Sequence, residues 1–118
     1  MPETLTYSNL FAGDYPVVTD IVTIGNAADL AVGTLLGKIT ATGKYVLCDT
    51  DGTDDGRRTG AAILGEAAAA ATAEVQALVY LSGVFDENQI IFATGETANT
   101  HRDALRDKNI YLKKAVAD

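Results

Sequence analysis

The chain has one cysteine, one histidine and no tryptophan. A single cysteine cannot form an intramolecular disulfide, so the fold has no disulfide framework. Cys48 ends the apolar run Tyr45-Val46-Leu47, where a free cysteine is usually a small buried hydrophobic residue. A nucleophilic thiol needs an activating group, and the only histidine, His101, is far away in the sequence. We therefore interpret Cys48 as a core residue.

Positive charge is absent from the start of the chain. No Lys or Arg precedes Lys38, and the 118 residues carry a formal net charge of −7. An acidic chain repels phosphate backbones, so nucleic acid is not expected as a direct partner. The N-terminus has neither a basic start nor a long apolar run, so neither a signal peptide nor a membrane span is expected. A soluble protein made in a reducing compartment is the resulting expectation.

Motifs of catalysis are also missing. The only serines are Ser8 and Ser82, and neither lies in a G-x-S-x-G turn. The sequence has no phosphate-binding loop and no His/Cys cluster with metal-ligand spacing. We therefore expect a protein that is not an enzyme and that uses no cofactor or metal. A small hydrolase with unrecognised residues remains a hypothesis.

The loop DTDGTDDG, residues 49–56, is the strongest candidate for a site. A calcium loop has Asp at positions 1, 3 and 5, Gly at 6 and a bidentate Glu at 12. When the loop starts at Asp49, position 6 is Asp54; when it starts at Asp51, position 12 is Ala62. These departures favour a solvated turn. A small cation- or ligand-binding β domain that uses this loop is kept as the alternative function.

Hydrophobic periodicity predicts a mainly β domain with one short helix. A hairpin is the clearest local signal, because the turn Ala41-Thr42-Gly43 separates two apolar runs. Residues 67–74 are expected to form a loop with at most one helical turn. The expected strands are 21–24, 35–40, 44–48, 61–66, 74–85, 89–93 and 110–112. In the strand at 74–85, one face is expected to consist of Val75, Ala77, Val79 and Leu81.

The sequence pattern of residues 97–109 predicts the single helix of the chain. Asn99 or Thr100 is expected to cap it, because their side-chain oxygens can accept the free amides of the first turn. Leu105 is expected to point inward. His101 is interpreted as a polar residue in the first turn of this helix.

Residues 1–18 differ from the rest of the chain, because they contain both prolines and show no sustained period. Pro16 disfavours helix at the residue before it. We expect a flexible, extended arm at 1–18 and a β-rich domain at 19–118. An extended arm can add a strand to the edge of a neighbouring sheet. The residues expected to make this contact are Thr4, Leu5, Thr6, Tyr7, Leu10 and Phe11.

The chain resembles the lambda-type head decoration proteins of tailed bacteriophages. Three segments carry the resemblance, in this order: LLGKITATGKYVLCDTDGTDDG, TGAAILGEAAAAATAEVQALVYLSGVFDENQIIF and RDALRDKNIYLKKAVA. The resemblance implies a compact β-clip-like domain without enzymatic activity. It implies a homotrimer at local threefold sites on the outer surface of the expanded head, bound to the major capsid protein. It also implies that the trimer stabilises the shell against packaged DNA, and that the arm becomes ordered on the capsid. Because the chain lacks tryptophan, particular aromatic contacts of the family are not carried over.

Overall fold

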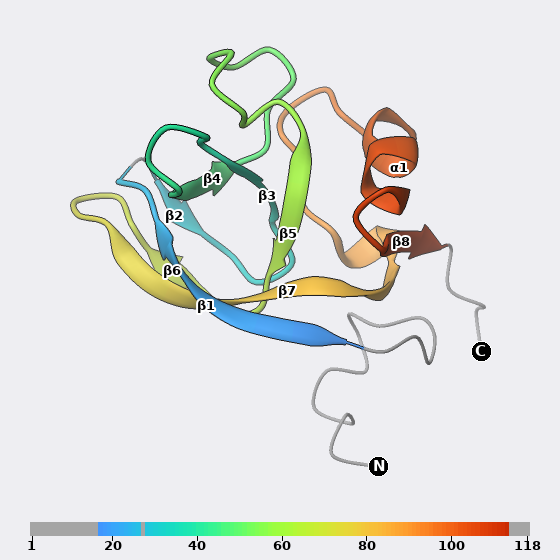
Figure 1. Ribbon diagram of the computed structural model, residues 1–118, viewed down its shortest axis with the longest axis horizontal. Coiled ribbons are helices and arrows are strands. Elements are labelled where there is room, and N and C mark those ends of the chain that lie inside the picture. Colours follow the sequence, from blue (N-terminus) through green and yellow to red (C-terminus); the bar gives the residue numbers. More distant parts are fainter. Residues whose placement is uncertain (1–16, 27, 114–118) are drawn as a thin grey trace.

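The computed structural model describes residues 17–26 and 28–113 (Figure 1). This part of the chain is mainly β with one α-helix, as the sequence predicted. The helical elements are the 3₁₀ helix η2 (Glu87–Gln89) and α1 (Ala98–Arg106). The strands are β1 (Val18–Ile24), β2 (Asp29–Leu30), β3 (Leu35–Lys38), β4 (Tyr45–Leu47), β5 (Gly60–Leu64), β6 (Ala68–Ala69), β7 (Val75–Asp86) and β8 (Ile110–Lys113).

Six strands form one sheet in the order β1-β4-β3-β5-β7-β8. Because β1 also pairs with β7, the first five of these strands close into a ring. The long strand β7 joins the parts of the fold, since it pairs with β1, β5 and β8. β2 and β6 form a separate two-stranded sheet. The ring encloses part of the core, and α1 packs beside β8 and β5 (Figure 1).

The predicted hairpin is confirmed as β3 and β4, which pair antiparallel. Its turn closes with hydrogen bonds from Gly43 N to Ile39 O and from Ile39 N to Lys44 O, both 2.8 Å. Gly43 has a φ of 76°, a left-handed conformation that glycine adopts without a steric penalty.

β7 follows the predicted alternation only in its first half. Ala77 and Val79 are buried, as expected. Leu81 was predicted on the same face but is only partly buried, and the next residue, Ser82, is buried instead. The cause is a β-bulge, because the register of β7 against β1 shifts by one residue at Leu81.

One predicted strand is wrong, and one predicted loop is wrong at two residues. The strand expected at 89–93 is replaced by η2 and by a single bridge between Ile91 and Thr34. The Asp86 carboxylate accepts a hydrogen bond from Asn88 N at 3.0 Å, and this contact starts a 3₁₀ turn where the sequence suggested extended chain. The segment expected as a loop, 67–74, is a loop except at Ala68–Ala69, which form β6 because they pair with β2. Ala68 and Ala70 also pack into the core.

Helix α1 is confirmed, but its N-cap is wrong. Thr97 is the capping residue, with extended backbone angles, and Asn99 and Thr100 lie inside the helix. The Thr100 hydroxyl accepts a hydrogen bond from Thr97 N at 3.1 Å, so it supports the first turn from within. Leu105 is fully buried, as predicted.

The core has two clusters. One lies between the sheet and α1 and includes Cys48, Phe85 and Leu105. The other fills the ring and includes Ile24, Leu36 and four buried alanines. Cys48 is fully buried, which confirms its interpretation as a core residue.

Candidate functional site

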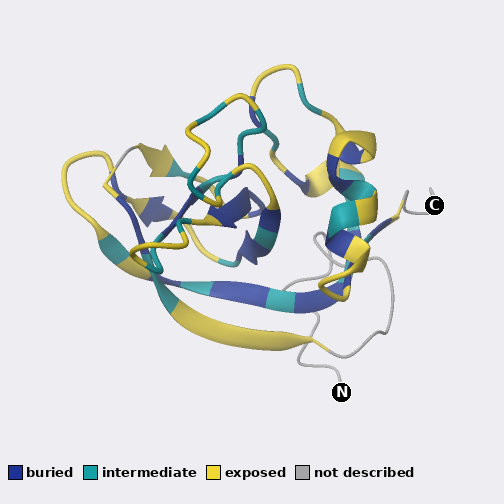
Figure 2. Ribbon diagram, turned by 45° about the horizontal axis from the view of Figure 1, so that its top comes forward, coloured by how far each residue is buried: buried dark blue, intermediate teal, exposed yellow. Residues whose placement is uncertain are grey.

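The outer part of β1 is the candidate interaction surface. All four residues from Val18 to Ile21 are exposed, although side chains in a strand alternate between two faces. Figure 2 shows β1 exposed along most of its length beside the buried strand β7. Val18 and Ile21 retain 52% and 56% of their surface, which is unusual for apolar residues within a strand. The described residues therefore leave this segment largely uncovered on both faces.

Within residues 17–26 and 28–113, one edge of β1 is also open along most of its length. Ile21 lies opposite Leu78 of β7. Leu78 N donates to the Glu66 carboxylate at 2.9 Å, and Leu78 O accepts from Gly65 N at 2.8 Å, so both groups point away from β1. Ile21 and Leu78 therefore form a non-hydrogen-bonded pair, and the backbone of Ile21 faces the other side of β1. On that side, the described residues pair with β1 only at Ile24, which bridges to β4.

The predicted contact residues Thr4, Leu5, Thr6, Tyr7, Leu10 and Phe11 all lie outside the described residues. The structure describes only the end of the predicted arm, where β1 begins at Val18 rather than at Ile21. Val18 N donates a hydrogen bond of 3.1 Å to Ser82 Oγ in β7. This contact anchors the chain where the predicted arm meets the domain.

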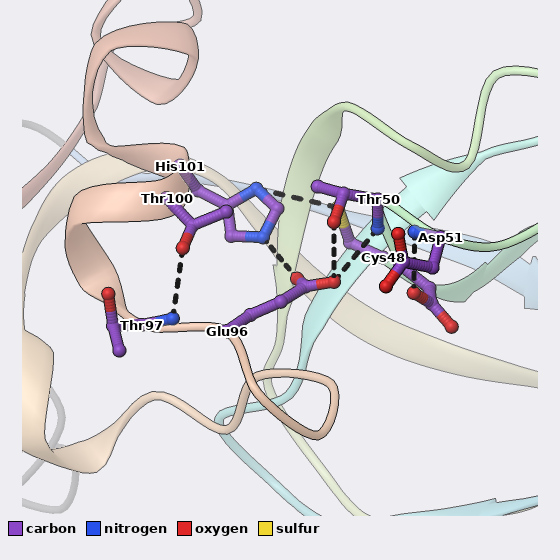
Figure 3. Close-up of polar contacts among 8 residues, drawn as sticks. Cys48, Thr50, Asp51, Glu96, Thr97, Thr100 and His101 are labelled. Atoms are coloured by element: carbon purple, nitrogen blue, oxygen red, sulfur yellow. Dashed lines mark hydrogen bonds and ion pairs between the residues drawn. The ribbon is translucent and has the colours of Figure 1, made fainter.

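A second site joins residues that the sequence keeps far apart (Figure 3). Cys48 Sγ, just after β4, lies 3.8 Å from Nδ1 of His101 in α1. His101 Nε2 lies 2.5 Å from Oε1 of Glu96. The other oxygen of Glu96 accepts hydrogen bonds from Thr50 N at 2.9 Å and Thr50 Oγ1 at 3.0 Å. Sequence reasoning missed this cluster, since Cys48 and His101 are 53 residues apart and no motif links them.

The surroundings of the cluster shift the pKa of the Glu96 carboxyl and the pKa of the Cys48 thiol in opposite directions. Burial alone would raise the pKa of Glu96, but hydrogen bonds from His101 and Thr50 outweigh it and hold this pKa below its usual value. Glu96 is therefore a carboxylate, and it accepts a hydrogen bond from His101 Nε2–H. Burial and, secondarily, the charges of Glu96 and Asp49 raise the pKa of Cys48 to about 12.

The cluster resembles the order of groups in a Cys–His–acid nucleophile, but its properties are those of a structural tie. The thiolate is the reactive form of cysteine, and a pKa near 12 keeps Cys48 protonated at neutral pH. Cys48 and His101 are 0% and 2% exposed, so a substrate has no access to them. The cluster connects α1 to the end of β4 and so fixes the helix on the sheet.

Ser82, the other nucleophile that the sequence offered, is also buried. Its hydroxyl oxygen accepts from Val18 N. His101 is engaged with Cys48 and Glu96 instead. The structure does not bring Ser82 and His101 together as a hydrolase pair.

The Asp/Gly loop at 49–56 is built from its own hydrogen bonds. Asp49 Oδ1 accepts from Asp51 N at 2.9 Å, which is an Asx turn. Both oxygens of Asp55 accept from Arg57, at 3.0 and 2.9 Å, and the hydrogen bond from Arg57 lowers the pKa of Asp55. Across residues 17–26 and 28–113, no three His, Cys, Asp or Glu side chains converge as a metal site.

Comparison with protein families places these features in context. The model of the family described as bacteriophage lambda head decoration protein D matches residues 3–110. The chain belongs to this family. The match spans almost all of the predicted arm and every described element up to the first residue of β8.

A search of curated proteins gave no significant match to the chain. Head decoration proteins are structural components of the phage capsid, so this chain has a decoration role in the virion. Within the described residues, no helix is long and apolar enough to cross a membrane.

Proposed function

We propose that this head decoration protein binds as a homotrimer to the outer surface of the expanded phage head. The trimer sits at local threefold sites, contacts the major capsid protein and reinforces the shell against packaged DNA. The observation that carries this proposal is the family match over residues 3–110, which includes the arm residues expected to contact the capsid.

The open edge of β1 supports a docking role for the arm. Residues 1–18 lead directly into β1, whose outer part is exposed on both faces and unpaired on one edge among the described residues. An arm that continues this strand can pair with a sheet edge of the capsid protein through main-chain hydrogen bonds. The side chains that would set its specificity are Leu5, Tyr7, Leu10 and Phe11, flanked by Thr4 and Thr6.

Trimerisation compensates for the weakness of one arm. Ordering an arm costs about 1–2 kcal/mol per residue, so a single arm binds weakly. Three arms on one trimer raise the effective concentration, and avidity of this kind adds about 10²–10⁴-fold. Assembly also gives a small domain further apolar surface to bury. The exposed apolar residues available for this burial are Val17, Val18, Ile21, Val32 and Ile91.

Deletion of residues 2–16 tests the role of the arm, because it leaves β1 intact. Sedimentation velocity should still give a trimer, whereas co-sedimentation with expanded heads should be lost. A paired variant, Tyr7→Ala with Phe11→Ala, should weaken head binding. Ser8→Ala with Asn9→Ala serves as a matched control in the arm, because neither residue is among the expected contacts. If the deletion variant still binds heads, the arm is not the capsid-binding element. A monomeric full-length chain that ignores expanded heads would refute the whole proposal.

Reinforcement of the shell is tested on filled heads. Heads that carry the trimer should retain their DNA to a higher temperature than undecorated heads, as followed by a DNA-binding dye. The arm-deletion variant is the control, and it should give no protection. Equal release temperatures with and without the full-length protein would contradict a stabilising role.

A further inference from the structure

Two lysines from distant parts of the chain line one groove. Lys38 ends β3, and Lys108 lies in the turn after α1. Thr40 and Thr59 contribute to the same groove, with Gly56 between them. Two lysines and two threonines therefore line the groove, and their ammonium and hydroxyl groups are of the kinds that donate hydrogen bonds to an oxyanion.

Most other cations of the described residues have a partner within the chain. The ion pairs are Lys44–Glu74, Arg57–Asp55, Arg102–Glu87 and Arg106–Asp103. Neither Lys38 nor Lys108 has an ion pair in residues 17–26 and 28–113; Lys38 only lies 6.0 Å from the centre of the Tyr45 ring. The chain has 16 acidic and nine basic residues, so two unpaired lysines in one groove are not explained by a shortage of carboxylates.

The backbone that carries the groove is fixed. Gly56 has a φ of +112°, and a Cβ at this position would lie 2.3 Å from Lys38 O. Only glycine lets the loop approach β3 this closely. The contact continues with a hydrogen bond of 2.9 Å from Thr40 N to Asp55 O. On the other wall, Lys108 N donates to Leu105 O at 2.9 Å.

We propose that this groove binds a carboxylate side chain from a neighbouring copy within the trimer. The inference rests on the trimer of the proposed function. In a cyclic trimer each interface is heterologous, so the groove of one protomer meets a different surface of the next. Each copy carries a net charge of −7, so copies repel one another unless positive groups face negative ones at the contact. Lys38 and Lys108 supply that complementarity, since neither has an ion pair among the residues of its own protomer that the structure describes.

The test removes the two charges in the full-length protein. In Lys38→Gln with Lys108→Gln, sedimentation equilibrium at low salt should show trimer dissociation at about tenfold or more higher concentration than in the wild type. The matched control, Lys44→Gln with Lys113→Gln, changes the net charge equally and should stay within about threefold of the wild type. Lys38→Arg with Lys108→Arg should restore the trimer, and high salt should reduce the difference between wild type and the Gln variant.

Two further measurements show whether the groove holds a carboxylate of a neighbouring copy or is open to a free anion. In the wild-type trimer, acetylation of lysines followed by mass spectrometry should leave Lys38 and Lys108 protected relative to Lys44 and Lys113. Inorganic phosphate should not shift the NMR signals of Lys38 and Lys108 in the trimer, because a carboxylate already fills the groove. Rapid acetylation, or a phosphate-dependent shift, would show an open anion site and overturn the inference.

The same experiments separate the role of the groove from the trimer itself. If the wild type trimerises and binds heads while the Gln variant dissociates no more readily, only the role of the groove is refuted. If the wild type is a monomer, the proposed trimer and the inference fall together.

Discussion

The buried pair of Glu96 and His101 gives the sharpest test of what holds the helix on the sheet. Their side chains are 6% and 2% exposed and their nearest atoms are 2.5 Å apart. His101→Ala removes the partner of a buried carboxylate and also the ring that stacks on Phe92 at 5.8 Å. The Glu96 carboxylate then keeps only its two hydrogen bonds from Thr50.

The expected cost of His101→Ala follows from this geometry. Leaving one member of a buried pair uncompensated costs about 3–5 kcal/mol, and the remaining bonds from Thr50 favour the lower end, about 3 kcal/mol. For a domain of this size, that corresponds to a fall in Tm of roughly 12 °C. Glu96→Gln keeps the shape and loses the charge, so about 1–2 kcal/mol is expected.

The contribution of Glu96 to the free energy of unfolding should decrease at acidic pH. Folding lowers the pKa of Glu96, because hydrogen bonds from His101 and Thr50 outweigh the opposing effect of burial. The unfolded chain therefore takes up this proton first as the pH falls. The contribution of Glu96 to stability is complete above the unfolded value of about 4.3 and is lost as the pH falls through the lower folded pKa. The difference in stability between wild type and Glu96→Gln should narrow below about pH 4.

Urea unfolding followed by circular dichroism measures these changes, at one fixed protein concentration because assembly shifts apparent stability. Glu74→Gln is the matched control, since its pair with Lys44 is 40–50% exposed and should contribute less than about 1 kcal/mol. If His101→Ala costs no more than Glu74→Gln, the cluster does not tie α1 to the sheet. A gap between wild type and Glu96→Gln that stays constant down to pH 3 would refute the charge argument.

Four further outcomes are expected. Cys48, whose pKa burial raises to about 12, should react with iodoacetamide only after unfolding, and rapid labelling of the native protein would contradict its burial. Gly56→Ala should cost more than about 2 kcal/mol, because it adds a backbone clash to left-handed strain, whereas Gly43→Ala has open space and should cost about 1 kcal/mol in the same urea assay. Arg102→Ala should cost about 1–3 kcal/mol through loss of its contacts with Glu87 and Leu112 O, and an unchanged unfolding midpoint would rule this out. Calcium titration of the wild type should give neither heat nor a rise in Tm; a saturable heat would revive the cation-binding alternative for loop 49–56.

Elements with strong local signals were predictable. The β3–β4 hairpin follows from apolar runs around a Gly-containing turn, and β7 and α1 follow from their hydrophobic periods. The wrong predictions lie where a side-chain hydrogen bond or pairing with a distant strand determines the backbone conformation. Asp86 turns the chain into η2 where a strand was expected, and pairing with β2 makes a strand of Ala68–Ala69, whose composition favours helix.

By itself the sequence determined the β-rich class, the single helix, the burial of Cys48 and membership of the decoration family, because these depend on residue type and on order along the chain. Only the tertiary structure decided that Cys48 and His101 meet, that Lys38 and Lys108 share a groove and that β1 keeps an open edge. The physical reason is that each of these features depends on how β7 and α1 pack against strands far away in the sequence. Local periodicity carries no information about those distances.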